Sequence, residues 1–308
     1  MQNIHIEGFG ITGALLALNL ERHAVPFTWS DIDAPHTAWK ASTGAVYPAG
    51  QPGSHCFEGH ASWLQWYHEG RYANPAWLEL AHYRFNHKRP PHEGGYRIVQ
   101  RDAYGLALAE PPALHFNAQL MVPETRQRFA DRRIEGARPK GSQVIVAHGF
   151  STRLNHAYWG YTRLVEVDYD GRPDNDREPR SAFYFREGRF IMAYAYPVPG
   201  TQYWYAGSKL IKQAAGRFKS LDMPSKYEAW KAQFERLGNG AVKVVGEADY
   251  IEGWRPARGD NSWVHRDLLG RIVVPPLWNS GIRHFPVVLR GVFDELGIND
   301  PSLQSIVI

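Results

Sequence analysis

The hydrophobic pattern at the start of the chain predicts a strand, a turn, a helix and a second strand. Ile4 and Ile6 lie in an apolar run that leads directly into a G-x-G-x-x-G pattern at residues 8–13. Residues 14–20 have the apolar content of a buried helix, and residues 25–30 form a second β-like run that ends at Asp31. This order of elements is typical of a dinucleotide-binding βαβ unit.

Apolar runs and turn residues predict the elements further along the chain. Trp63, Trp66 and Tyr67 stand at helical spacing within residues 56–72, and such a stripe is more typical of packing than of function. Strands are predicted at residues 107–122, 182–185, 189–196, 203–208 and 241–251. A capping box at residues 225–228 predicts a helix that ends at Leu237 with Gly238 as its C-cap, and the last helix is predicted over residues 287–296.

Each glycine of the G-x-G-x-x-G pattern has a distinct expected structural role. Gly8 makes the tight turn, Gly10 lets a pyrophosphate approach the backbone, and Gly13 lets the helix pack on the strand. The start of the helix, which includes Thr12, points its free N–H groups at the phosphates. Asp31 stands where a carboxylate binds the ribose. The alternative is a glycine-rich turn with a purely structural role.

A second small-residue segment, Ser42-Thr43-Gly44-Ala45, follows Asp31 after a short polar stretch. NAD would not require such a segment, but it suits the flat edge of an isoalloxazine ring. At this point the sequence resembles the D-amino-acid oxidase/glycine oxidase family of FAD enzymes, in which a small-residue segment lies along the flavin. The resemblance implies FAD as the cofactor. We expect it to be bound non-covalently, because Cys56 lies far in sequence from the C-terminal flavin loop where some relatives attach it.

The same resemblance implies an α/β fold with a Rossmann-like FAD-binding domain, interrupted by an α+β substrate domain with an antiparallel sheet. Residues 143–151 resemble the family's strand that returns to the nucleotide sheet, and they place Gly149 beside the FAD. The FAD-binding domain is then expected at residues 1–60, 141–165 and 250–308. The substrate domain is expected at residues 61–140 and 166–249.

Two residues resemble the family's substrate-binding groups. Arg255 lies in Gly-Trp-Arg-Pro at residues 253–256, where the family's arginine forms a two-pronged pair with the substrate carboxylate. Its alternatives are a structural ion pair and a contact with the flavin edge. Tyr196 precedes the turn at residues 197–200, where a family tyrosine helps to hold the same carboxylate. Its alternative is a tyrosine that fills one sheet face.

The segment before the last helix resembles the family's loop that faces the flavin. There a helix N-terminus stabilises negative charge on the reduced ring. The corresponding residues are Gly281, Ile282, Arg283 and His284, and Arg283 or His284 could supply positive charge directly. Pro286 stands where a glycine is usual, although proline suits a first helical turn.

The resemblance implies that a neutral amine gives a hydride to flavin N5 and that dioxygen is the expected acceptor. Three functions stay open. The first is oxidation of a glycyl group on a modified nucleobase in DNA, as in the viral hypermodification of thymine. The second is oxidation of free glycine, sarcosine or a D-amino acid with release of hydrogen peroxide. The third is a non-catalytic or NAD-linked dinucleotide-binding protein.

Charge bears on the first of these functions. The chain of 308 residues has a formal net charge of +4, and Arg126, Arg128, Arg132 and Arg133 form a basic cluster. The cluster is interpreted either as a nucleic-acid contact or as a solvated helix face. Abundant aromatic residues are candidate stacking platforms for bases.

The cysteine count and the apolar runs bear on the cellular compartment of the protein. The only cysteine is Cys56, so no internal disulfide can form, which fits a reducing compartment. Met1 leads straight into the first strand, so no signal peptide is expected. No apolar run approaches 18 residues, so no membrane span is expected. We therefore expect a cytoplasmic enzyme, of the cell or of an infected host, with no metal site.

Overall fold

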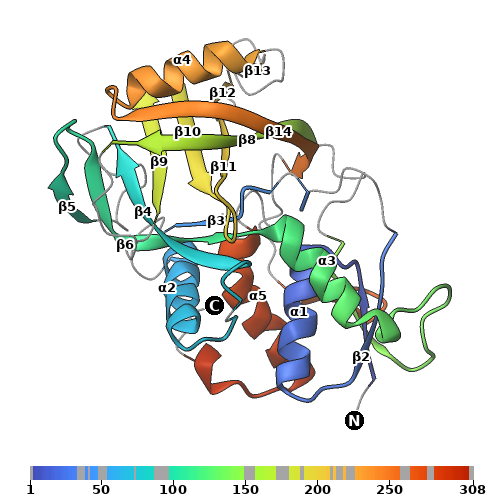
Figure 1. Ribbon diagram of the computed structural model, residues 1–308. Coiled ribbons are helices and arrows are strands. Elements are labelled where there is room, and N and C mark those ends of the chain that lie inside the picture. The colour runs from blue at the N-terminus through green and yellow to red at the C-terminus, as the bar shows by residue number, and fades with distance from the viewer. Residues whose placement is uncertain are drawn as a thin grey trace.

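The computed structural model describes residues 3–32, 39–40, 42–47, 54–72, 74–86, 97–148, 157–170, 180–187, 191–208, 211–212, 218–219, 226–256, 264–275 and 281–304. Within these ranges the chain forms two main sheets with helices packed around them (Figure 1). Figure 1 shows α4 on the upper side of the larger sheet and α1, α2 and α5 below it.

The smaller sheet has five strands in the order β15-β16-β7-β1-β2. Its strands are β1 (Ile4–Glu7), β2 (Phe27–Ser30), β7 (Gln143–Val146), β15 (His265–Arg266) and β16 (Ile272–Val273). β1 runs parallel to both β2 and β7, and β16 runs parallel to β7. The predicted return of residues 143–146 to the first strand is therefore confirmed. This sheet with α1 (Ile11–Arg22) is a Rossmann-like unit.

The larger sheet has nine strands in the order β14-β8-β11-β10-β9-β4-β6-β3, with β5 also paired to β6. Its strands are β3 (Ala45–Val46), β4 (Leu78–Phe85), β5 (Arg97–Arg101), β6 (Ala107–Phe116), β8 (Ala157–Tyr169), β9 (Ser181–Glu187), β10 (Ile191–Pro197), β11 (Trp204–Ser208) and β14 (Val242–Pro256). The pairings are antiparallel except that between β4 and β9. β8 and β14 pair along their whole lengths, so the predicted domain boundaries at residues 165 and 250 fall inside these two strands.

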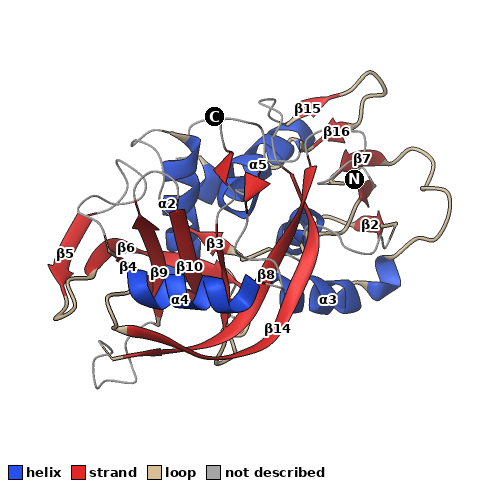
Figure 2. Cartoon of the chain, turned by 90° about the horizontal axis from the view of Figure 1, so that it is seen from above, coloured by secondary structure: helices blue, strands red, loops and turns tan. Residues whose placement is uncertain are grey.

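Three apolar clusters hold the elements together. One lies between α1, α2 (His55–His68), α5 (Gly281–Leu296) and both sheets, and a second lies between α4 (Tyr227–Leu237) and one face of the larger sheet. The view from above shows α4 crossing the strands of that face (Figure 2). The third covers the opposite face and is rich in tyrosine and alanine. A short pair of strands, β12 (Ile211–Lys212) and β13 (Phe218–Lys219), stands apart from both sheets.

The aromatic stripe on α2 packs in the first cluster, as predicted. Trp63 and Trp66 are fully buried, and the Trp63 indole N–H donates to the Ile282 carbonyl oxygen at 2.7 Å. That carbonyl is available because Pro286, four residues later in α5, has no N–H to donate to it. Trp63 therefore supplies the hydrogen bond that the proline removes.

Two sequence predictions about helices were wrong, and a third is tested only in part. Residues 118–122 belong to α3 (Ala118–Arg128) and not to a strand, because the Asn117 side chain accepts from the Leu120 N–H and starts a helix. The predicted helix end at Leu237 with Gly238 as its C-cap is confirmed, whereas the predicted capping box involves Ser225, which lies outside the described residues. α5 begins at Gly281, which puts Pro286 inside the helix and not at its first turn.

Among the described residues the structure also has two short 3-10 helices, at Ala130–Arg132 and Pro301–Leu303. In the part of the chain that the structure describes, no helix is long and apolar enough to cross a membrane.

Candidate nucleotide and flavin site

The glycine loop between β1 and α1 has little room for side chains, except at its middle position. Gly8 has φ +98°, and a Cβ there would lie 2.7 Å from the Ala147 carbonyl oxygen. A Cβ at Gly13 would overlap the Gly8 carbonyl oxygen. At Gly10 the nearest described atom to a Cβ would be Trp39 Cδ1, at an ordinary contact distance of 3.5 Å, so this position is the least crowded of the three. Gly10 is also the position at which a pyrophosphate would approach the backbone.

The start of α1 offers backbone donors toward the same space. Gly10 is the N-cap and makes no side-chain capping bond, and the helical hydrogen bonds begin with the Ala14 N–H, which donates to the Gly10 carbonyl oxygen at 2.9 Å. The N–H groups of Ile11, Thr12 and Gly13 precede that bond, so they have no acceptor within the helix. An anion at this end of the helix would be stabilised by these groups and by the helix dipole. The loop and helix therefore fit a dinucleotide.

Asp31 follows β2, beside this loop, and its carboxylate has two kinds of partner. One oxygen accepts from the Ile32 N–H at 2.9 Å, and the other forms an ion pair with Arg126 of α3. Arg126 also donates from Nε and Nη2 to the Phe9 carbonyl oxygen, at 3.1 and 2.9 Å. This arginine therefore joins the predicted ribose-binding acid to the glycine loop.

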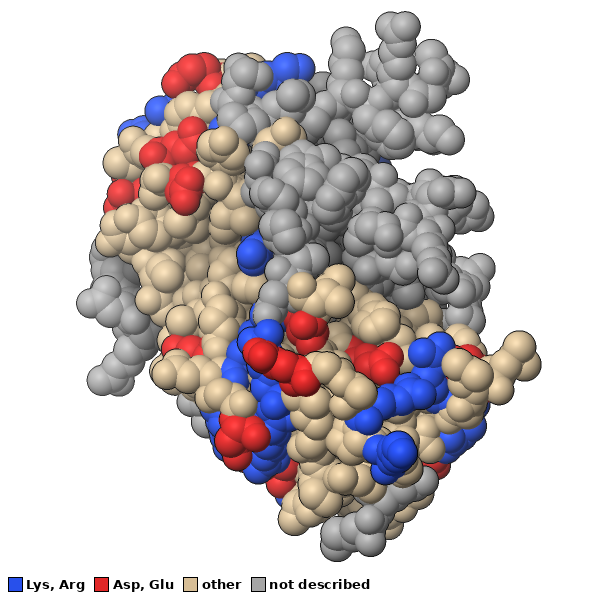
Figure 3. Space-filling model, turned by 90° about the vertical axis from the view of Figure 1, so that its right-hand side faces the viewer, with Lys and Arg blue, Asp and Glu red and all other residues tan. Residues whose placement is uncertain are grey.

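The rest of the basic cluster is also paired with acids or packed on rings. Arg128 lies 2.5 Å from the Glu21 carboxylate, Arg132 lies 4.0 Å from it, and the Arg133 guanidinium is 5.4 Å from the centre of the Trp29 ring. On the face of the molecule seen in Figure 3, basic and acidic side chains lie next to each other. These pairs lower the positive potential that a nucleic acid would meet. Nucleic-acid binding by the cluster stays a prediction, and the ion pairs do not favour it.

The small-residue segment 42–45 is fixed against the larger sheet. Gly44 has φ +62°, and a Cβ there would overlap the Phe116 carbonyl oxygen, so only glycine fits this close approach. Its carbonyl accepts from the Phe116 N–H at 3.0 Å, and its N–H donates to the Ser42 Oγ at 3.2 Å. The Gln119 amide donates to the Ser42 carbonyl at 3.1 Å. Ala45 then enters β3 opposite His115 of β6.

The start of α5 reaches the same region. Arg283 is buried, and its guanidinium lies 4.0 Å from the centre of the Tyr47 ring, directly after β3. Gly59 lets α2 approach the backbone of α5 closely, because a Cβ there would overlap the Arg283 carbonyl oxygen. Ile282 is also buried, and His284 lies on the next position of the helix. The structure thus brings Arg283 next to the segment that the sequence predicts along the flavin.

Tyr196 lies in the tyrosine-rich face of the larger sheet. Its ring stacks on Tyr194 with centroids 4.8 Å apart, and the His115 ring is 5.4 Å away. Burial, together with Tyr83 and Tyr47 nearby, raises the pKa of Tyr196 well above its ordinary value. Tyr196 is therefore a neutral hydroxyl inside an aromatic cluster, and its role toward a carboxylate stays a prediction.

His115 and Trp39 are neighbours of this site that sequence reasoning missed. His115 is fully buried, and burial together with Arg180 lowers its pKa to about 3, so its imidazole is neutral. Trp39 lies against the glycine loop, as described above. Neither residue belongs to a motif, so only their tertiary neighbours reveal them.

The Arg255 side chain and the whole of Gly149 lie outside the described part of the structure. Arg255 lies on β14 opposite Tyr158 of β8, and nothing is described of its side chain. Gly149 lies outside the described residues. Their predicted roles therefore stay predictions.

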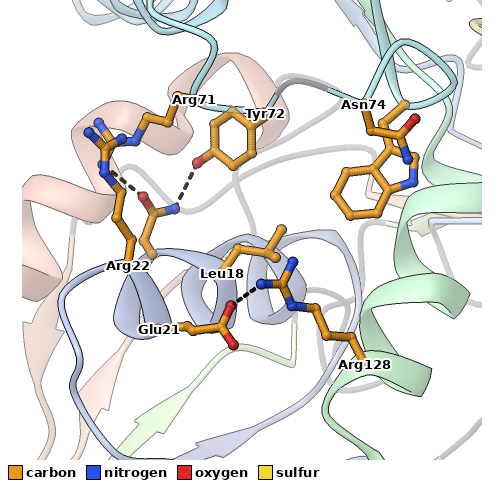
Figure 4. A pocket seen from close by; sticks show the side chains of 9 residues that line it. Leu18, Glu21, Arg22, Arg71, Tyr72, Asn74 and Arg128 are labelled. Atoms are coloured by element: carbon orange, nitrogen blue, oxygen red, sulfur yellow. Dashed lines mark hydrogen bonds and ion pairs between the residues drawn. The ribbon is translucent and has the colours of Figure 1, made fainter.

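A pocket of about 660 Å³ opens at the other end of α1, away from the glycine loop (Figure 4). Its lining comprises Leu18, Asn19, Glu21, Arg22, Arg71, Tyr72, Asn74, Trp77 and Arg128. The Arg71 guanidinium donates to the Asn19 side-chain oxygen at 2.7 Å, and the Asn19 amide donates to the Tyr72 hydroxyl at 2.7 Å. None of the sequence-predicted cofactor residues lines it. Among the described residues, no group of three or more His, Cys, Asp or Glu side chains could hold a metal ion.

Comparison by sequence identifies no relatives: no protein-family model matches the chain, and no curated protein matches it. Comparison of folds finds solved structures that are similar to this chain. Iminodiacetate oxidase from Chelativorans sp. BNC1 is 15% identical with a TM-score of 0.62, over 97% of this chain and 96% of that chain. Glycine oxidase from Geobacillus kaustophilus is 11% identical with a TM-score of 0.62, over 98% and 96%. An FAD dependent oxidoreductase from Pseudomonas aeruginosa is 16% identical with a TM-score of 0.54, over 97% and 92%. The chain therefore has the fold of these oxidoreductases over nearly its whole length.

Proposed function

We propose that this chain is an FAD-dependent oxidoreductase that oxidises the C–N unit of an amine carrying a carboxylate. One observation carries the proposal: residues 39–40 and 42–46 lead from the glycine loop to the larger sheet. Trp39 lies at Gly10, and β3 pairs with β6 beside the start of α5. A long dinucleotide placed along this segment would extend from Asp31 toward Arg283, as FAD requires and a mononucleotide does not.

The residues that would hold the cofactor follow from this placement. The pyrophosphate would lie at Gly10 and at the free N–H groups of α1, and the ribose at Asp31. The flavin end would lie against residues 42–45, with residues 281–284 of α5 near it. We propose that FAD binds non-covalently. Denaturation of the loaded protein tests this directly, because it should then release free flavin.

Bound FAD would supply the hydride acceptor. The chain's own task is then to place the amine and to stabilise charge. The N-terminal end of α5 and the buried Arg283 guanidinium would favour negative charge on the reduced flavin. The neutral Tyr196 and His115 offer hydrogen bonds without adding charge to the same face.

The substrate class is supported by the residues and by the printed names of two similar structures. Iminodiacetate oxidase and glycine oxidase, two proteins with this fold, are named after compounds that are both amines with carboxylates. Arg255 is the proposed carboxylate clamp, and Tyr196 is the proposed second contact. A glycyl group on a nucleobase meets the same description, but the ion pairs of the basic cluster give nucleic acid no advantage over a free amine.

The proposal is tested with purified protein and FAD. We expect the protein to take up flavin and its visible absorbance to bleach when glycine, sarcosine or iminodiacetate is added without oxygen. Hydrogen peroxide should appear when air is admitted. A nucleoside carrying a glycyl group is the fourth substrate, and glycerol 3-phosphate is the control without an amine. Protein that binds no FAD would contradict the proposal, and bleaching by glycerol 3-phosphate alone would change the substrate class.

Two alanine substitutions in the glycine loop are expected to act differently. Gly10→Ala should destabilise the apoprotein much less than Gly13→Ala, because among the described residues the added Cβ meets Trp39 Cδ1 at an ordinary 3.5 Å, but it should weaken FAD binding at least about tenfold by filling the phosphate approach. Gly13→Ala should destabilise the apoprotein itself, because its Cβ would overlap the Gly8 carbonyl. Thermal unfolding without FAD and fluorescence titration with FAD separate the two effects. Equal affinities of Gly10→Ala and wild type would place the phosphates elsewhere.

A further inference from the structure

Arg126 occupies a different environment from the other arginines of the basic cluster. Arg128 and Arg132 both reach Glu21 on α1. Arg126 instead reaches Asp31 and the Phe9 carbonyl, which lies between the first two glycines of the loop. Its side chain is only 21% exposed, and its guanidinium lies 5.8 Å from the centre of the Trp39 ring. Arg126 therefore links Asp31, the glycine loop at Phe9 and the Trp39 ring.

We infer that Arg126 is a positioning residue of the adenosine subsite, which holds Asp31 for the ribose of the dinucleotide. This inference rests on the proposed function, since it needs a nucleotide at the glycine loop. Arg126 Nη2 donates to one oxygen of the Asp31 carboxylate, and the Ile32 N–H donates to the other. A carboxylate oxygen can accept more than one hydrogen bond, so the ribose hydroxyls and Arg126 can share it.

The charges around the loop give a physical reason for this arrangement. A pyrophosphate brings negative charge to the glycine loop, where the Asp31 carboxylate is already close. Without a cation between them the two anions would repel each other. Arg126 neutralises Asp31, so the acid can bind ribose without adding net negative charge beside the phosphates. The two contacts to the Phe9 carbonyl fix the guanidinium in this place.

The test compares Arg126→Gln with Arg128→Gln, which removes an arginine two residues away on the same helix. Apoprotein is titrated with FAD, ADP, 2′-deoxy-ADP and riboflavin 5′-phosphate, and thermal unfolding is recorded for each variant. We expect Arg126→Gln to weaken FAD and ADP binding by roughly 10- to 100-fold, the size of one or two lost charge-assisted hydrogen bonds. Binding of riboflavin 5′-phosphate, which has no adenosine, should not change. Arg128→Gln should bind all four ligands as wild type does.

A double-mutant cycle with Asp31→Asn then tests the coupling between the two residues. We expect the effects of Arg126→Gln and Asp31→Asn on ADP affinity to be non-additive, and 2′-deoxy-ADP to lose less affinity than ADP in both variants. Arg126→Lys should recover part of the affinity, because it restores the charge but not the fork.

Three results would overturn the inference. Equal loss of ADP and riboflavin 5′-phosphate, with a lower unfolding temperature, would make Arg126 a structural residue only. Tighter ADP binding by Arg126→Gln would mean that Arg126 competes with the ribose. Unchanged ADP and FAD affinity would remove Arg126 from the site. Wild-type protein that binds neither FAD nor ADP would instead contradict the proposed function itself.

Discussion

Arg255→Ala is expected to lower kcat/KM for a carboxylated amine by about 100- to 1,000-fold while FAD stays bound. A planar guanidinium binds a carboxylate through two parallel hydrogen bonds, and removing one partner of such a pair costs about 2–5 kcal/mol, of which each 1.4 kcal/mol is tenfold. β14, the strand at the edge of the larger sheet, carries Arg255 near the end of its pairing with β8. Stopped-flow bleaching of the flavin measures the effect.

Its controls separate the clamp from the alternatives. Arg255→Lys should lie between wild type and Arg255→Ala, because it keeps the charge and loses the fork. Arg236→Ala, which removes an arginine exposed on α4, should leave kcat/KM unchanged. Oxidation of an amine without a carboxylate should be insensitive to Arg255→Ala. Purification of Arg255→Ala without flavin would assign the residue to the cofactor, and unchanged turnover would remove it from the site.

Asp300→Asn is expected to cost roughly 3–5 kcal/mol of folding free energy, because it leaves a buried arginine without its counter-ion. The Asp300 carboxylate accepts from Arg71 at 2.8 Å and from His23 at 3.0 Å, and both the Arg71 and Asp300 side chains are at most 5% exposed. This network joins α1, the end of α2 and the 3-10 helix at Pro301–Leu303. Urea denaturation of the apoprotein measures the loss.

The pH dependence of stability checks the same network. Burial alone would raise the pKa of the Asp300 carboxyl, but the Ser302 hydroxyl, Arg71 and His23 lower it to about 2. Because the pKa of this carboxyl is lowered on folding, its contribution to stability is fully present at pH values above the ordinary carboxyl pKa of 3.8. This contribution is lost as the pH falls toward 2. Asp300→Asn should lack this component of the pH dependence. Glu187→Gln, at an exposed ion pair with Arg236, serves as the control and should unfold as wild type does.

The sequence predicted the parts of the fold that are encoded by local pattern. The glycine loop, its flanking strands and the return strand at residues 143–146 were found, because short-range spacing and apolar runs specify them. The start of α3 was missed although Asn117 is a recognisable N-cap, because the apolar residues continue across it without a break. The sequence predicts Pro286 at a helix start because proline suits a first helical turn. The structure instead tolerates Pro286 inside α5, because Trp63, 219 residues away from Ile282, supplies the missing hydrogen bond.

The candidate site shows a similar division. Asp31 and residues 42–45 were predicted from their distance to the glycines, but the pairing of Asp31 with Arg126 joins residues 95 positions apart. Nothing in the spacing of the arginines distinguishes the one at the glycine loop from those at Glu21. Only the packing of α3 along α1 separates them.

The order of strands in the smaller sheet has a consequence for how the protein can be divided. β7, from the middle of the chain, lies between β1 at its beginning and β16 near its end. No contiguous fragment shorter than about residues 4–273 contains all of its strands. Cleavage of the chain between β7 and β16 should therefore yield pieces that remain associated under native conditions. Neither piece expressed by itself should form the smaller sheet.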